Sequence, residues 1–188
     1  MKNLIYISAL FITVIFTQFN INSVNALNQN KDLLSFSELQ GEKLISSKKF
    51  ILSVNKTCKG ESKLCTIVKI KNNYYLQFSK LDDDEITISK LKNNVELKLK
   101  KIKNDNQFFI EIELLSYKNN EKVDSIICYE YKNDPNDSLA TEKLYYFKNY
   151  ELWTLDFTYD LESTTAENWK KYKVNQNSGK FELLKNTQ

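Results

Sequence analysis

Residues 151–160 read ELWTLDFTYD, and the rest of the chain can be organised around this stretch. An extended strand sends successive side chains to opposite faces, so the stretch has one aromatic face and one mostly polar face. The residues of its aromatic face are Trp153, Leu155, Phe157 and Tyr159. We expect this strand to be central in a β-sheet, with these side chains against the core.

The same two-residue alternation recurs along most of the chain. Residues 95–100 read VELKLK, with apolar side chains on one face and charged ones on the other. Runs of this length and pattern are typical of half-buried strands. The pattern predicts eleven strands: Lys49–Val54, Thr66–Ile70, Tyr74–Leu81, Ile86–Leu91, Val95–Ile102, Phe108–Tyr117, Ser125–Lys132, Lys143–Phe147, Leu152–Tyr159, Trp169–Val174 and Lys180–Leu184.

Short links rich in asparagine separate these runs. Residues 71–73, 92–94 and 118–120 all read KNN, and 104–106 and 175–179 are similar in character. Asparagine tolerates the left-handed backbone of tight hairpin turns, so it can replace the scarce glycine here. Strands joined by such short links must be mostly antiparallel, because parallel crossovers need longer connections.

These observations predict an all-β fold, an antiparallel meander that closes into a small barrel or a two-sheet sandwich. The barrel is favoured because sequential hairpins leave few long crossings and closure removes sheet edges. We place one β domain at 49–188, after a lead-in at 27–48 that forms a short helix or an ordered arm. One or two short helices are expected elsewhere. One is at 133–141, where Pro135 follows Asp134, and 162–168 forms either the start of a second or a loop.

The first 26 residues resemble an export signal. Lys2 precedes an apolar run at 4–16, polar residues follow, and 24–26 read VNA before the expected cleavage point. The run is shorter than the roughly 20 apolar residues of a membrane span. We therefore expect cleavage after Ala26, a periplasmic or extracellular location, and no stable membrane span in the mature chain.

The cysteines fit an oxidising compartment. Cys58 and Cys65 flank the short segment KGESKL and are the predicted disulfide pair. Cys128 lies in an apolar run, where a buried free thiol is the favoured interpretation. A bridge from Cys128 to one of the other two cysteines, or to another chain, is the alternative.

Composition excludes several chemistries. All 27 basic residues are lysines, and the chain has neither arginine nor histidine. Histidine-activated nucleophiles and imidazole metal sites are therefore absent. The three glycines are far apart, so no glycine-rich phosphate loop can form.

Removal of the signal leaves 27 − 1 = 26 lysines against 24 acids, a net charge of +2 that gives no case for nucleic acid binding. We predict no cofactor, no metal and no enzymatic activity.

The aromatic residues carry the remaining signal for function. The chain has 11 Tyr, 11 Phe and 2 Trp, and several tyrosines lie on or beside predicted strands. Tyrosine provides contact area for a partner at low entropic cost. The candidate contact residues are Tyr74, Tyr145 and Tyr150, although half-buried tyrosine is also common in any sheet.

Three functions remain open at this point. The first is an exported, non-catalytic binding protein that recognises another macromolecule, such as an inhibitor or immunity-type protein. The second is a carrier that holds a small apolar ligand inside a β-barrel. The third, a hydrolase that uses carboxylates alone, would need two facing acids, and the polar-face residues Asp156 and Asp160 are its candidates.

Overall fold

The structure is a computed structural model that describes residues 38–57, 70, 72–102, 109–133, 135–136, 138–160 and 163–187. The chain divides into two compact units, Met1–Ser35 and Phe36–Gln188, and only the second is described below. The expected signal segment lies outside the described residues, as do Cys58 and Cys65 of the predicted disulfide.

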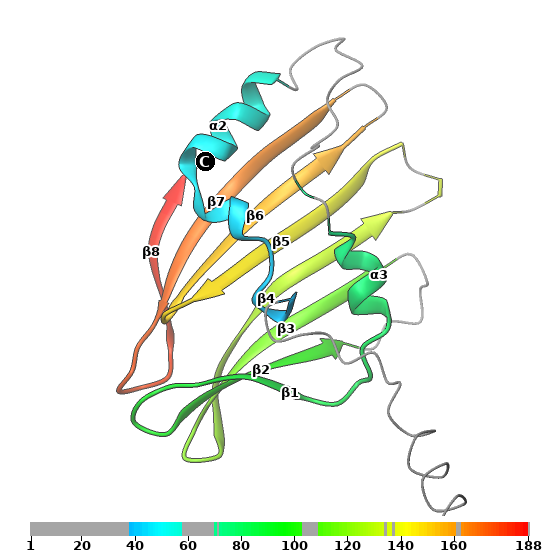
Figure 1. Ribbon diagram of the computed structural model, residues 1–188. Helices are drawn as coiled ribbons and strands as arrows, with labels where there is room; N and C mark the ends of the chain where they lie inside the picture. Colours follow the sequence, from blue (N-terminus) through cyan, green and yellow to red (C-terminus); the bar gives the residue numbers. More distant parts are fainter. Residues whose placement is uncertain are drawn as a thin grey trace, which may run out of the picture. The chain divides into compact units, whose positions relative to one another are not determined.

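The second unit is built on one antiparallel sheet of eight strands in sequence order (Figure 1). The prediction of an antiparallel meander is therefore confirmed. The predicted closure is wrong, because β1 and β8 do not pair and a single open sheet replaces both the barrel and the sandwich. The strands are β1 Ile86–Lys90, β2 Val95–Ile102, β3 Phe109–Lys118, β4 Glu121–Asn133, β5 Ala140–Lys148, β6 Glu151–Tyr159, β7 Thr164–Val174 and β8 Phe181–Thr187.

Helices cover one face of the sheet, which is open rather than closed on itself. Helix α2 (Lys48–Thr57) packs on β7, and helix α3 (Tyr74–Ser79) packs on β3 (Figure 1). Two short 3-10 turns, η1 (Glu38–Gln40) and η2 (Lys43–Ser46), lie against β5. The apolar face thus finds its partners in the N-terminal part of this unit.

Both helices replace predicted strands, which corrects the assignments at 49–54 and 74–81. In α2 the buried residues are Phe50, Ile51 and Val54, and this spacing forms one stripe of a helix. In α3 the buried residues Tyr74 and Phe78 are four positions apart. The Asn73 side chain accepts a hydrogen bond from the Leu76 amide at 3.0 Å and caps α3, so this KNN link starts a helix rather than a hairpin.

The remaining helix predictions also differ from the structure. Strand β7 runs through most of the 162–168 segment, with a bulge where Asn168 has φ 54° and lets Trp169 turn inwards. Residues 135–136 form a turn rather than a helix, and β5 already begins at Ala140.

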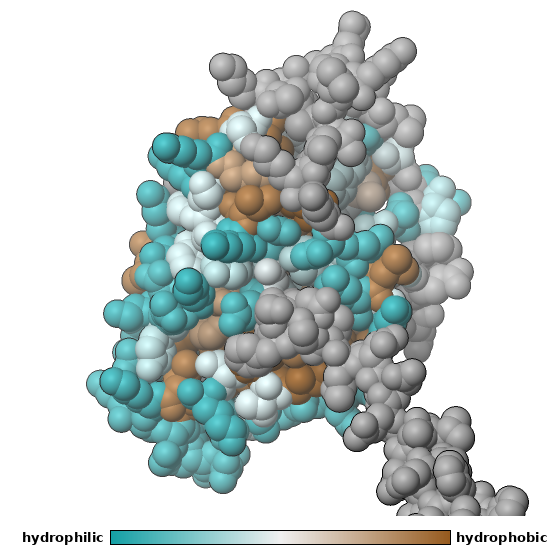
Figure 2. Space-filling model, in the orientation of Figure 1, coloured by the Kyte–Doolittle hydropathy of each residue, from teal (hydrophilic) through white to brown (hydrophobic). Residues whose placement is uncertain are grey.

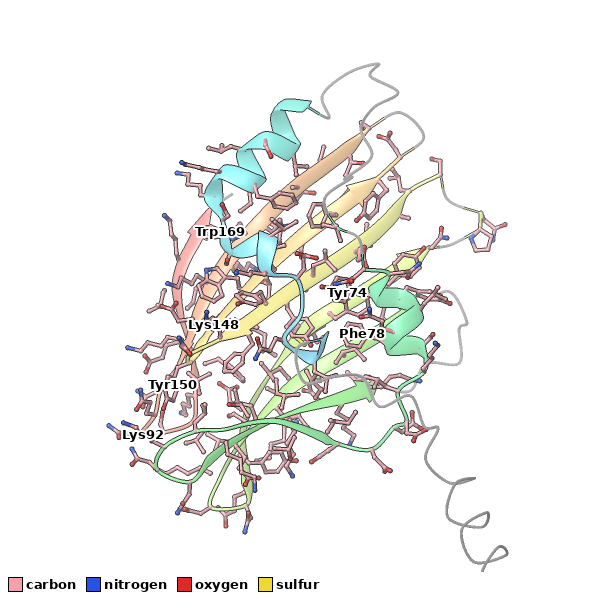
Figure 3. All side chains as sticks on the ribbon, viewed as in Figure 1. Tyr74, Phe78, Lys92, Lys148, Tyr150 and Trp169 are labelled. Carbon is pink, nitrogen blue, oxygen red and sulfur yellow. The ribbon has the colours of Figure 1, made fainter. Side chains whose placement is uncertain are left out.

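The asparagine turns are confirmed at two hairpins. Asn93 and Asn94 have φ values of 58° and 57°, and Asn119 and Asn120 have 50° and 67°. Two successive residues with positive φ match the twist of the flanking strands. Hydrophilic residues gather at this end of the sheet (Figure 2), and Lys92, Lys148 and Tyr150 lie there too (Figure 3).

Strand β6 buries part of its predicted aromatic face, whereas Trp153 and Tyr159 are only half-buried. Leu155 and Phe157 are fully buried, and β5 and β7 pair with it on either side. On the opposite face, which was expected to be mostly exposed to water, Leu152 and Thr154 are also buried.

The sheet separates between β4 and β5, and another segment occupies part of the gap. These strands pair only through 130–133 and 140–143. Beyond that point Gly41 forms a bridge with Tyr146, and the Glu42 amide donates to the Tyr145 carbonyl at 2.7 Å. The segment around Gly41 therefore supplies β5 with the neighbour that β4 no longer provides.

The β7–β8 hairpin packs its tip against β3 and β4. The Ser116 hydroxyl donates to the Gly179 carbonyl at 2.6 Å, and the Phe181 amide donates to the Asp124 carboxylate at 2.9 Å. Ser116 is completely buried, so this bond satisfies a polar group that would otherwise be costly there.

Cys128 is a buried free thiol, as the favoured interpretation predicted. It lies at a bulge in β4 and donates to the Ile112 carbonyl at 3.5 Å. Burial raises the pKa of this thiol far above its usual value, so the thiolate form needed for disulfide exchange is suppressed.

Trp169 also holds the η2 segment against the sheet through Ile45, and this contact gives a prediction. The Trp169 indole N–H donates to the Ile45 carbonyl at 2.8 Å in a buried setting. The Trp169→Phe variant leaves that carbonyl without its partner and should lose about 1–3 kcal/mol of unfolding free energy in urea denaturation. Trp153→Phe, at a half-buried ring, is the control and should cost less. Equal losses in the two variants would show that the indole bond contributes nothing.

Candidate functional site

A hollow lined by several tyrosines and one glutamate lies beside α3, and we call it the tyrosine pocket. Its volume is about 620 Å³. Such a volume falls within the roughly 300–1,000 Å³ of small-ligand sites. Its lining residues are Ile70, Asn72, Asn73, Tyr74, Tyr75, Tyr131, Ala140, Glu142 and Tyr159.

Strand register brings the floor of this pocket together. Tyr131 of β4 lies opposite Glu142 of β5, and Ala140 of β5 lies opposite Tyr159 of β6. This is the short stretch where β4 and β5 still pair, so three neighbouring strands present side chains to one place. Helix α3 forms the adjoining wall through Tyr74 and Tyr75.

Glu142 is the acidic centre of the pocket. One carboxylate oxygen accepts from the Tyr129 hydroxyl at 3.0 Å, and the other accepts from the Tyr159 hydroxyl at 3.1 Å. Burial raises the pKa of Glu142, while these two hydrogen bonds oppose the rise. Burial and the nearby carboxylate raise the pKa values of both tyrosines, so both remain proton donors at neutral pH.

A second carboxylate, that of Glu42, is connected to the pocket through Tyr74 of α3. The Tyr74 hydroxyl donates to Glu42 at 3.3 Å and accepts from the Asn72 side chain at 3.3 Å. Burial is the main cause that raises the pKa of Tyr74. Figure 3 shows Tyr74 and Phe78 on the side of α3 that faces the sheet.

Aromatic contacts hold the rings of the pocket in place. Tyr75 and Tyr131 have ring centroids 4.8 Å apart with planes tilted by 51°. Below them Phe78 contacts the ring of Tyr129 at 4.6 Å. Tilted contacts at these separations are favourable for aromatic pairs, so the rings are preorganised by the fold.

A second hollow, of about 420 Å³, lies on the opposite face of the sheet, and we call it the polar pocket. Lys143 lines it and, by strand alternation, points away from the face of Glu142. Asp156 also lines it, and its Oδ1 atom is buried without a hydrogen bond, with the Lys143 ammonium 3.9 Å away. This face carries other lysine–carboxylate pairs, such as Lys122 with Glu113 at 3.5 Å.

The three predicted contact tyrosines have different positions. Tyr74 lines the tyrosine pocket and is almost fully buried. Tyr145 is buried in the core, where its hydroxyl donates to the Leu39 carbonyl at 2.6 Å, so a partner could reach it only if this packing opened. Tyr150 lies in the β5–β6 turn with φ 67° and is half-buried. The structure therefore brings only Tyr74 to the pocket.

Sequence reasoning missed Glu142, Tyr131 and Tyr159. The sequence assigns Tyr159 only to the aromatic face of its strand, Tyr131 is one of several strand tyrosines, and Glu142 is one acid among 24. What distinguishes them is the pairing register of β4, β5 and β6, which brings these residues together. That register depends on where β4 and β5 stop pairing. Asp156 and Asp160 are not in this pocket, and Asp160 instead accepts hydrogen bonds from Ser163.

A stability prediction follows from the raised pKa of Glu142. A carboxyl group with a raised folded-state pKa binds more protons in the folded protein than in the unfolded chain. Its contribution is therefore lost as pH rises from the ordinary value near 4.5 through the raised value. Glu142→Gln should remove this loss.

The measurement is the unfolding free energy of the wild type and of Glu142→Gln between pH 4 and pH 8. The difference between the two should change with pH in favour of the variant. Glu111, whose pKa is also raised, and Glu85, whose pKa is lowered, are present in both proteins and cancel. A difference that stays constant with pH would contradict the assignment.

The described residues show neither a metal-binding cluster nor a membrane-spanning helix. Among the residues that the structure describes, no three acidic or cysteine side chains converge as metal ligands would. None of the helices in the same residues has the length and apolarity that a membrane span requires.

Comparison with known proteins gives no family for this chain. No family model matches it, and neither a curated protein nor a solved structure matches it.

Proposed function

We propose that this chain is an exported, non-catalytic binding protein that recognises another protein through the tyrosine pocket. The observation that supports this proposal best is the arrangement of Tyr75, Tyr131 and Tyr159 around Glu142 in one preformed hollow. Rigid aromatic rings with a fixed polar centre are typical of sites that hold a partner.

The pocket is less suited to the other two functions. A carrier of an apolar ligand would bury that ligand against the Glu142 carboxylate, and the barrel expected for it is not formed. A carboxylate hydrolase needs a pair of acids, whereas Glu142 is the one acid among the described residues that line the tyrosine pocket. Glu113 and Asp156 both line the polar pocket, but a lysine accompanies each of them.

Photo-crosslinking in the exported fraction tests this proposal. Tyr75 of the full chain is replaced by p-benzoylphenylalanine, and Leu183, which is half exposed on β8, is replaced in a matched control. We expect one defined protein adduct from position 75 and none from position 183. Adding Tyr131→Leu to the position-75 chain should reduce that adduct. No adduct at position 75, or the same adducts at both positions, would contradict the proposal.

A further inference from the structure

We propose that the tyrosine pocket binds an alkylammonium group, with Glu142 as its counter-ion and the rings of Tyr75, Tyr131 and Tyr159 around it. This inference rests on the proposed binding site and adds the chemical class of its ligand. The group can belong to a lysine side chain of a partner protein or to a free small amine, and both share this chemistry.

The charge of the pocket favours a cation. Glu142 lines it, no lysine is among its described lining residues, and Glu42 lies one hydrogen bond behind Tyr74. The site is therefore negative and aromatic, although the chain has 27 lysines and many of them follow the strands. The polar pocket differs in this respect, because Lys143 and Lys170 both line it.

The hydrogen bonds of the lining disfavour a sugar. Both Glu142 oxygens already accept tyrosine hydroxyl protons, and the Asn73 oxygen is used to cap α3. The Asn72 amide donates to Tyr74. A polyhydroxylated ligand needs donors and acceptors that are still available, whereas a substituted ammonium needs mainly negative charge and ring faces.

The rings are placed to provide those faces. Tyr75 comes from α3 and Tyr131 from β4, and their planes meet at 51°, so the two rings form a corner rather than a closed stack. Tyr159 adds a ring from β6 whose orientation is fixed by its bond to Glu142 and by its contact with Phe157, with centroids 6.1 Å apart. Aromatic faces attract a cation through the electrostatic field of the ring, and the attraction is stronger where the cation is desolvated.

Protonation of Glu142 should control this binding. The groups that face it are Tyr129 and Tyr131 from β4, Tyr159 from β6 and Tyr74 from α3. No cation is among these described groups, and burial raises the pKa of the carboxyl. A bound ammonium would supply the missing positive charge, and acid should weaken binding as Glu142 takes up a proton.

The test is a titration of the isotope-labelled full chain with tetramethylammonium chloride, followed by NMR at constant ionic strength. We expect saturable shifts at Tyr75, Tyr131 and Glu142 at neutral pH. tert-Butyl alcohol, a neutral molecule of similar shape, should give no saturable shift. Equal responses to the two probes on the wild-type protein would overturn the inference without reference to any variant.

Two matched glutamine variants isolate the charge. Glu142→Gln should weaken tetramethylammonium binding about tenfold or more, because it removes the counter-ion but keeps the size of the side chain. Glu130→Gln makes the same change on the opposite face, where Glu130 pairs with Lys132 at 3.0 Å, and should leave binding unchanged. Equal effects of the two variants would overturn the inference.

Further arms distinguish the sources of the ammonium group and separate this inference from the proposed function. A lysine-bearing partner predicts that tetramethylammonium competes with the photo-adduct at position 75, whereas a free amine predicts probe binding without an adduct. If the adduct forms but tetramethylammonium neither binds to the protein nor reduces the adduct, the ammonium inference is overturned and the binding function stands. Probe binding without any protein adduct would overturn the proposed function and leave the inference standing.

Discussion

Gly41→Ala should destabilise the folded chain by about 3 kcal/mol or more. Gly41 has φ 81°, and a Cβ atom there would lie 2.1 Å from the carbonyl oxygen of Tyr145 and 2.9 Å from its carbonyl carbon. These are backbone atoms of β5, so the contact cannot be relieved by moving a flexible side chain. The bridge to Tyr146 and the Glu42–Tyr145 hydrogen bond should separate together.

The matched control for this prediction is Gly179→Ala. Gly179 has nearly the same φ, 80°, but its added Cβ would meet no atom closer than 3.6 Å. Only the left-handed backbone strain of about 1–2 kcal/mol should then remain. Urea denaturation of both variants separates the two effects. Similar losses at the two positions would show that the segment around Gly41 is not packed against β5 as described.

Phe78→Ala should cost about 3–5 kcal/mol of unfolding free energy, as is typical for a buried phenylalanine. Phe78 is 1% exposed, and its ring contacts Tyr129 at 4.6 Å and Tyr145 at 6.1 Å. Together with the buried Tyr74, it packs α3 against the sheet. Its loss should therefore also disorder the helical wall of the tyrosine pocket.

Leu76→Ala is the control in the same helix. Leu76 is 54% exposed, so its truncation should change stability by less than about 0.5 kcal/mol. Chemical denaturation gives both values, and near-ultraviolet circular dichroism reports on the packing of the aromatic side chains as a group. A Phe78→Ala loss as small as that of Leu76→Ala would mean that α3 is not docked.

Much of the sheet could be predicted from local pattern. Strands β2, β3 and β6 follow the alternation of apolar and polar residues, and the hairpins at Asn93 and Asn119 follow the conformational tolerance of asparagine. The buried free thiol of Cys128 also follows from its apolar run. Each of these features depends on neighbours in the sequence.

The helices and the closure could not be predicted in the same way. In 74–81 the apolar residues fit both a strand and a short helix, and only the Asn73 cap and the sheet beneath Phe78 decide between them. Closure depends on whether the first and last strands meet or the helices cover the exposed face. That choice is made by tertiary packing, in which Trp169 contacts a carbonyl 124 positions away.

The candidate site depends on contacts between residues that are still farther apart in the sequence. Tyr75, Tyr131 and Glu142 meet because α3 docks over the place where β4 and β5 stay paired. A two-residue error in that register would move Glu142 away from Tyr131, and no local motif records the register. The sequence makes Tyr74 a candidate contact residue only as a tyrosine on a predicted strand, and no pattern in the sequence predicts the pocket.

The most direct test of the account is the titration of the Glu142 carboxyl carbon by NMR, with and without tetramethylammonium, with Glu130 as internal reference. The tyrosine pocket predicts a pKa for Glu142 above its ordinary value near 4.5, and a fall of that pKa when the cation is added. Glu130 should not respond to the cation. An ordinary pKa at Glu142 that tetramethylammonium leaves unchanged would contradict the account.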